Sequence, residues 1–183
     1  IPEANRGRLL LHLHGGAYVL YPGEAGAGEA MVMAGYGGFR VVSVDYRMAP
    51  DHPFPAALED ALAVYRALIA ETPAAAQPYR GLVALLAGQG DVTGAEATLT
   101  AGLAATEDAD LLFLQAGLLE SRGNYNGAIA VYETLYARDS GNAVVANNLA
   151  SLLTTQRADP GSLERAHAIA RRLRGRGRST RVI

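Results

Sequence analysis

The feature that most constrains this fold is a recurrence of residue types every 33 or 34 positions in the second half of the chain. One set, at the shorter spacing, consists of Leu86, Gly90, Ala95, Leu99 and Leu103, which are followed by Leu119, Gly123, Ala128, Tyr132 and Tyr136. A second set, at the longer spacing, consists of Leu112, Ala116 and Leu119, which are followed by Ala146, Ala150 and Leu153. Because a unit of this length holds two helices and a turn, the recurrence predicts about three stacked helical hairpins.

The region before these repeats follows a different pattern, in which strand and helix signals alternate. Residues 9–13 form a short apolar run, typical of a strand covered on both faces, and residues 39–47 form a second run rich in β-branched residues. A helix is expected from about residue 24 to 36, and another after Pro55, which suits a helix start. Strand, helix, strand, helix predicts two parallel strands joined by a crossover.

Two stretches of this region carry a family resemblance. "LHLHGGAYVL" is followed, after an intervening helical segment, by "VVSVDYRMAPDHPFPAALEDALAVYRAL". Together they resemble the hormone-sensitive-lipase-like branch of the α/β-hydrolase esterases over about a third of the chain. The resemblance implies a parallel sheet, a serine–histidine–acid triad and ester hydrolysis without a cofactor. It also implies an oxyanion-hole loop, whose backbone N–H groups bind the tetrahedral intermediate, at His14, Gly15, Gly16 and Ala17.

The other parts of such an active site are missing from the sequence. The chain contains no G-x-S-x-G motif, Ser43 lies within the second strand, and the late histidine, His167, lies in a helical segment. Residues 80–94 admit two interpretations, a decayed nucleophile elbow or a hairpin turn at Gly90, and both leave no nucleophile. His12 lies two positions before His14 on the same strand, but without a third ligand we predict no metal site.

The helical units resemble tetratricopeptide repeats, which bind peptides in the groove formed by the first helix of each unit. By that register, the predicted groove residues are Phe113, Gly117, Glu120, Asn147, Ser151 and Thr154. The alternative for these polar positions is plain solvent exposure. Residues 171–180 hold five arginines, for which phosphate binding and a solvated helix end are the two interpretations, and the latter is favoured.

These patterns predict a fusion of two parts. Residues 1–72 form a partial α/β-hydrolase-like segment, 73–78 a linker, 79–175 about three tetratricopeptide-like repeats, and 176–183 a basic tail. The expected fold class is therefore an α/β fragment followed by an all-α repeat array. Two strands do not make a stable sheet alone, so the open sheet edges also suggest self-association.

Composition limits the function further. A net charge of −2 argues against a chain that binds nucleic acid along its whole length. The absence of cysteine excludes disulfides and thiolate sites. No apolar run is long enough to cross a membrane. We expect a cytoplasmic protein without cofactor. The favoured function is an interaction scaffold that binds a protein or peptide through the repeats, with an esterase-like segment that is catalytically incomplete. The alternative is a carboxylesterase or lipase-type serine hydrolase whose triad is supplied elsewhere.

Overall fold

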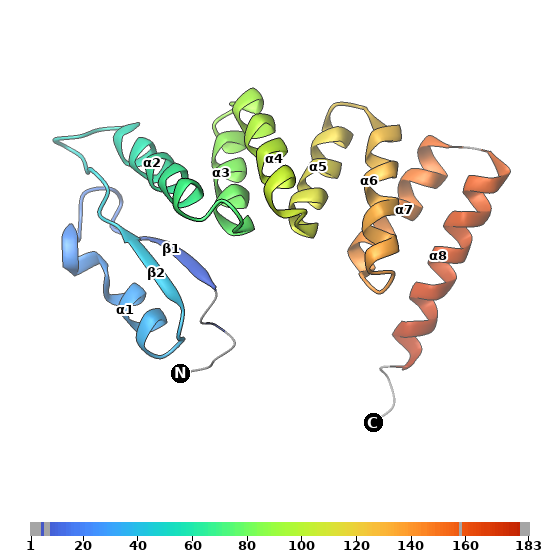
Figure 1. Cartoon of the computed structure of the whole chain (residues 1–183), viewed down its shortest axis with the longest axis horizontal. Coiled ribbons are helices and arrows are strands. Elements are labelled where there is room, and N and C mark those ends of the chain that lie inside the picture. The colour runs from blue at the N-terminus through green and yellow to red at the C-terminus, as the bar shows by residue number, and fades with distance from the viewer. Residues whose placement is uncertain (1–4, 6–7, 158, 180–183) are drawn as a thin grey trace. The chain divides into compact units, whose positions relative to one another are not determined.

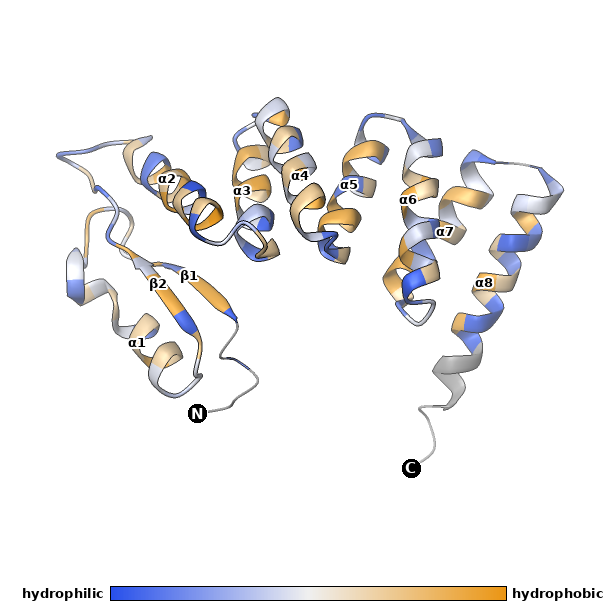
Figure 2. Cartoon of the chain, viewed as in Figure 1, coloured by the Kyte–Doolittle hydropathy of each residue, from blue (hydrophilic) through white to orange (hydrophobic). Residues whose placement is uncertain are grey.

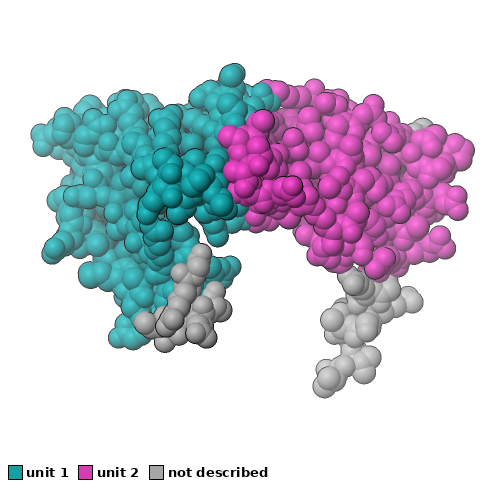
Figure 3. All heavy atoms as spheres, in the orientation of Figure 1, with its two compact units in different colours: residues 1–98 teal, residues 99–183 magenta. Residues whose placement is uncertain are grey.

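A computed structural model describes residues 5, 8–157 and 159–179, with only the backbone described for 175–179. The chain divides into two compact units, Ile1–Thr98 and Leu99–Ile183, which Figure 3 shows in two colours. The boundary between them lies within a helix and does not coincide with the predicted linker. Each unit is therefore described by itself.

The first unit begins with a two-stranded parallel sheet. Strand β1 (Leu9–Leu13) pairs with β2 (Arg40–Val44) in a register that runs from Leu9 opposite Arg40 to Leu13 opposite Val44 (Figure 1). The predicted parallel pairing is confirmed. The crossover between the strands contains a 3-10 turn, η2 (Gly23–Gly26), and helix α1 (Gly28–Gly35). The single helix expected over residues 24–36 is thus split, because the glycine-rich sequence around residue 27 interrupts it.

Both strands are apolar along most of their length, as Figure 2 shows by colour. The expectation that β1 is covered on both faces is wrong: its first four residues are half-buried and Leu13 is 46% exposed. The physical reason is the size of the sheet, since each described strand has a single strand neighbour. Self-association through these edges stays a prediction.

Two helices of the first unit follow β2. Helix α2 (Ala56–Glu71) starts directly after Pro55, as predicted, and buries Ala61, Leu62 and Leu68. Helix α3 (Ala76–Gly88) packs against α2. Gly81 of α3 permits this contact, because a Cβ there would lie 2.2 Å from the ring of Tyr65. Since α3 begins at Ala76, part of the predicted linker is helical.

Helix α4 (Val92–Thr106) contains the boundary between the units, and four helices follow it. They are α5 (Ala109–Ser121), α6 (Tyr125–Arg138), α7 (Ala143–Gln156) and α8 (Pro160–Ser179). Each packs against the next, in the order expected for consecutive antiparallel hairpins. The core contains Leu149 and three alanines, Ala116, Ala128 and Ala146, all fully buried, and the small alanine side chains let the helices approach closely. The second unit is therefore all-α.

The turns between helices recur with the sequence. In the first turn, the amides of Gln89 and Asp91 donate to the carbonyl of Leu86, and the amide of Gly90 donates to that of Ala87. The next hairpin has the same pattern 33 positions later: Arg122 and Asn124 donate to Leu119, and Gly123 donates to Glu120. Both glycines have positive φ, +80° at Gly90 and +71° at Gly123, which favours glycine. The interpretation of residues 80–94 as a decayed elbow is wrong, because the residues before Gly90 are helical.

The helix caps recur as well. Asp108 caps α5 by accepting from the amides of Asp110 and Leu111. Asn142, at the equivalent position of the next hairpin, caps α7 by accepting from Val144 and Val145. The same local chemistry therefore starts the first helix of two successive hairpins.

Tyr132 links three helices of the second unit through its hydroxyl. The hydroxyl donates to Glu120 Oε1 on α5 at 2.7 Å and accepts from Asn148 Nδ2 on α7 at 3.1 Å. The ring is 1% exposed and meets Phe113 edge to face, with centroids 5.8 Å apart. Burial, and then the bond to Glu120, raise the pKa of Tyr132 to about 12.

We expect Tyr132→Phe to remove a pH dependence of stability between pH 10 and about 12. Because the folded-state pKa is raised above the unfolded value of 10.0, the stabilisation is fully present below pH 10 and is lost as pH rises toward 12. Urea unfolding of both proteins at pH 9 and pH 12 measures the difference. Tyr125→Phe, at a more exposed tyrosine on the same helix, should keep the wild-type difference. Equal pH dependence in wild type and Tyr132→Phe would contradict the assignment.

The C-terminal helix continues into the predicted basic tail. Helix α8 includes residues 176–179, whereas 180–183 lie outside the described residues. Arg171, Arg172 and Arg174 are exposed. Among the described residues, no helix combines the length and apolar character needed to cross a bilayer.

Candidate functional site

The segment after β1 forms a tight loop, residues 14–18, which we call the glycine loop. Its carbonyl at Gly16 accepts from the amides of Val19 at 3.0 Å and Leu20 at 2.9 Å. Three successive residues have positive φ: Gly16 at 124°, Ala17 at 54° and Tyr18 at 63°. Within the described residues, the amides of Gly16 and Ala17 donate no backbone hydrogen bond. The loop therefore offers two adjacent N–H groups for an external acceptor.

His14, the first residue of this loop, is buried and stacks on Tyr46. The two rings lie 4.3 Å apart with an interplanar angle of 7°, and the Tyr46 hydroxyl donates to the His14 carbonyl at 2.5 Å. Burial, and then the neighbouring Tyr18, raise the pKa of Tyr46. His14 Nδ1 lies 2.8 Å from the Gly15 carbonyl. His14 thus holds the base of the loop, and its carbonyl and ring are both fixed by Tyr46.

Two further contacts fix the flanks of the loop. The amide of Ala49 donates to the Tyr18 carbonyl at 2.9 Å, and the amide of Gly23 donates to Asp45 Oδ1 at 2.8 Å. A Cβ on Gly26 would lie 2.6 Å from His14 Cγ, so glycine is required where η2 meets the buried ring. The loop is held from both sides by the segment that follows β2.

The segment after β2 is itself anchored to α2. The Arg47 amide donates to Asp60 Oδ2 at 2.7 Å, and its guanidinium contacts Asp60 at 2.9 Å and Glu59 at 3.1 Å. The hydrogen bond to Asp60, and then that to Glu59, raise the pKa of Arg47. Arg47 thus anchors the second of the two stretches that carry the sequence resemblance, and Tyr46 and Ala49 join it to the first.

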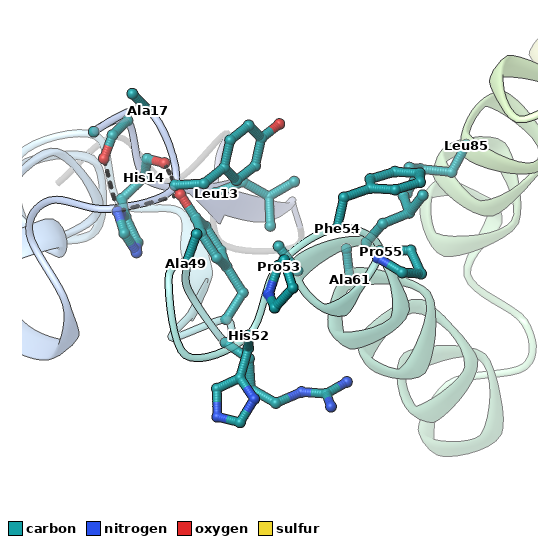
Figure 4. A pocket seen from close by; sticks show the side chains of 17 residues that line it. Leu13, His14, Ala17, Ala49, His52, Pro53, Phe54, Pro55, Ala61 and Leu85 are labelled. Carbon is teal, nitrogen blue, oxygen red and sulfur yellow. Dashed lines mark hydrogen bonds between the residues drawn. The ribbon is translucent and has the colours of Figure 1, made fainter.

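A cavity of about 680 Å³ lies beside the glycine loop, within the first unit. Figure 4 shows it between the loop, the segment after β2 and the start of α2. Its side chains are mostly apolar and include Leu13, Phe54, Leu58 and Leu85. Phe54 is 86% exposed, so the cavity is open at this side. Gly16 and Ala17, whose amides have no backbone partner among the described residues, are thus part of the lining of a mainly apolar cavity.

His14 and His52 line this cavity, but none of its lining residues is a serine, threonine or cysteine that could act as the nucleophile. Ser43 lies in β2 and is absent from the cavity lining, and His167 is exposed on α8 in the other unit. His12 and His14 have separate neighbours, and the described residues contain no cluster of three potential metal ligands. At this cavity the described residues supply the glycine loop and a mainly apolar wall, without a serine nucleophile.

The predicted groove residues lie on α5 and α7. Gly117, Asn147, Ser151 and Thr154 are exposed. Phe113 and Glu120 are partly buried, because both contact Tyr132 of α6. Their grouping into one binding groove stays a prediction.

Sequence reasoning missed the role of Tyr46 and the cavity residues His52 and Phe54. Tyr46 lies in the D-Y-R triplet, which indicated the family but not the contact that Tyr46 makes. No local pattern reveals its stacking contact with His14, because the contact depends on the strand register.

The glycine loop, the parallel strands and the anchored D-Y-R segment are together those of an α/β-hydrolase-type segment. The chain belongs to the alpha/beta hydrolase fold family, whose sequence model matches residues 10–156.

Known relatives are similar over part of this chain. The acetyl-hydrolase of Streptomyces hygroscopicus is 41% identical over 68 residues, which cover 37% of this chain and 23% of that protein. Esterase LipI of Mycobacterium tuberculosis is 42% identical over 65 residues, or 36% of this chain and 20% of that protein. The crystal structure of esterase E25 aligns with a TM-score of 0.38 at 43% identity, covering 44% of this chain and 28% of that one. The chain matches about a quarter or less of the length of these two curated relatives.

Proposed function

We propose that the first unit provides the oxyanion hole and one wall of the substrate site of a carboxylesterase-type hydrolase. The observation that carries this proposal is the pair of adjacent amides at Gly16 and Ala17, at the edge of an apolar cavity. In ester hydrolysis the carbonyl oxygen becomes an oxyanion, and fixed N–H donors stabilise it more than they stabilise the substrate. The named activities of the relatives support the same reaction class.

Complete catalysis needs a serine nucleophile and a histidine base, which we assign to polypeptide other than the sequence described above. Esters with a short apolar acyl or alcohol group are the proposed substrates, because the cavity side chains are mainly apolar. The absence of a G-x-S-x-G motif predicts that the isolated chain shows no turnover of 4-nitrophenyl acetate at this site. No cofactor is needed for this reaction.

Amide chemical shifts test the donor role in the intact chain. We expect monomethyl methylphosphonate, a tetrahedral anion, to shift the ¹⁵N–¹H resonances of Gly16 and Ala17 in a saturable manner. Acetamide at the same concentration lacks the negative charge and should shift them less. The Gly28→Ala protein is a matched control that should show the same shifts, because Gly28 lies outside the cavity lining and a Cβ there meets nothing within 4 Å. Shifts confined to other residues would contradict the proposal.

We propose a second function, peptide binding, for the helical hairpins, which resemble tetratricopeptide repeats. The recurrence of turn hydrogen bonds and of helix caps in successive hairpins supports this resemblance. The proposed groove consists of the α5 and α7 residues named above. The exposed amide of Asn147 would bind the backbone of an extended peptide.

Peptides selected from a displayed random library on the intact chain test the groove. Asn147→Ala should weaken their binding about 10-fold, as expected for a lost buried hydrogen bond. Thr134→Ala, at an exposed position of α6, should leave binding unchanged. If every selected peptide bound both variants equally well, the groove assignment would be wrong.

A further inference from the structure

Ser43, His12 and Glu29 are far apart in the sequence but lie next to one another in space, on the face of the sheet that is next to α1. The strand register places His12 of β1 directly opposite Ser43 of β2. Ser43 Oγ lies 3.0 Å from His12 Nδ1, and Glu29 Oε2 lies 3.6 Å from His12 Nε2. Three elements, β1, β2 and the first turn of α1, thus bring a hydroxyl, an imidazole and a carboxylate into line.

The geometry of this group fits one neutral tautomer of His12. With the ring proton on Nε2, which faces Glu29, Nδ1 can accept a hydrogen bond from the Ser43 hydroxyl. The His12 side chain is 13% exposed and Glu29 is 73% exposed, while Ser43 is open to solvent. The serine is therefore accessible and hydrogen-bonded to His12, and the Glu29 carboxylate lies 3.6 Å from the other ring nitrogen.

An apolar groove of about 210 Å³ leads to the same place. It is lined by Leu10, Leu11, Ala30, Met33 and Val41, together with His12 and Glu29. Val41 precedes Ser43 by two positions on one strand, so both side chains lie on the same face of the sheet. Ser43 is not part of the groove lining, but it contacts His12, which is, so a short alkyl chain in the groove would bring an attached carbonyl or phosphoryl group toward the His12–Ser43 pair.

We propose that Ser43, His12 and Glu29 form a second acyl-accepting site, separate from the glycine loop. Its substrates are activated esters with a short apolar chain. Ser43 Oγ forms a bond to the acyl carbon, His12 Nδ1 takes the hydroxyl proton, and the bond to the leaving alkoxide or phenoxide breaks. With a fluorophosphonate the new bond is to phosphorus, and fluoride leaves. The site uses no residue of the glycine loop, so it stands or falls independently of the function proposed above.

Labelling of the intact chain with a butyl-bearing fluorophosphonate tests this proposal. Trypsin cleavage after Arg40 and Arg47 releases the peptide "VVSVDYR", in which Ser43 is the sole serine. Fragmentation should locate the adduct on Ser43 and not on Tyr46, and Ser151, an exposed serine on α7, should remain unlabelled. No adduct on Ser43, or one on Tyr46 instead, would overturn the proposal.

Variants assign the roles of the two partners. His12→Gln should slow labelling on the order of 100-fold, the effect of losing a general base. Glu29→Gln should slow it less, whereas Glu24→Gln, at a glutamate in η2 outside this group, should have no effect. Circular dichroism confirms that each variant is folded. Equal labelling rates for wild type and His12→Gln would overturn the proposal.

A unique thiol gives a second measurement, because the natural chain has no cysteine. The thiol introduced by Ser43→Cys should react with iodoacetamide at lower pH than the thiol introduced by Ser151→Cys, since His12 stabilises the thiolate. Adding His12→Gln should remove that difference. Identical pH–rate profiles for the two single variants would show that His12 does not activate position 43.

Discussion

Replacing Gly16 with alanine should lower the free energy of unfolding of the first unit by about 3 kcal/mol or more. A Cβ at this position would lie 2.3 Å from the Leu20 carbonyl oxygen, and the φ of +124° is one that residues with side chains rarely adopt. The carbonyl of Leu20 is backbone and cannot rotate away, so the whole turn must rearrange. Urea unfolding followed by circular dichroism measures the effect.

Neighbouring positions provide controls for this prediction. Gly15→Ala should change stability by less than about 0.5 kcal/mol, because nothing lies within 4 Å of the new methyl group. Ala17→Gly should stabilise the loop by up to about 1 kcal/mol, since Ala17 has a φ of 54° that glycine adopts without steric cost. A Gly16→Ala protein that unfolds at the wild-type urea concentration would show that the loop geometry is incorrect.

Leu149→Ala should destabilise the second unit by roughly 3 kcal/mol. Leu149 is fully buried in the core formed by α5, α6, α7 and α8, so truncation removes apolar contacts and leaves a cavity. Val144→Ala removes a smaller apolar side chain from the same helix, but Val144 is 58% exposed and the expected change is below about 0.5 kcal/mol. Urea unfolding of both variants tests the contrast. Equal losses at the two positions would contradict the assigned core.

Sequence patterns predicted the local elements of this protein well. The β-branched run and the apolar run gave two parallel strands, and Pro55 marked the start of α2. The turn glycines Gly90 and Gly123 of the first two hairpins were predicted because the repeat spacing is visible without any structure. The helix expected over residues 24–36 was split, since a flexible glycine sequence competes with a weak helical pattern.

The contacts that bring the site residues together depend on the strand register, and they could not be predicted from the sequence. Stacking of His14 on Tyr46 and the hydrogen bond of His12 to Ser43 both join residues that are far apart in the sequence. The sequence indicated that His12 and Ser43 lie in neighbouring strands, but a shift of one position in the register would separate them. The glycine loop was predictable from its motif, whereas the cavity beside it required the positions of α2 and α3.

A chimera tests the central claim most directly, that the first unit is a working oxyanion segment of an ester hydrolase. The 68 matched residues of the Streptomyces hygroscopicus acetyl-hydrolase would be replaced by those of this chain, and hydrolysis of 4-nitrophenyl acetate measured. We predict activity comparable to the parent's, and a loss of about 100-fold or more when the chimera carries Gly16→Ala. A chimera that melts at the parental temperature yet hydrolyses the ester no faster than buffer would contradict the claim.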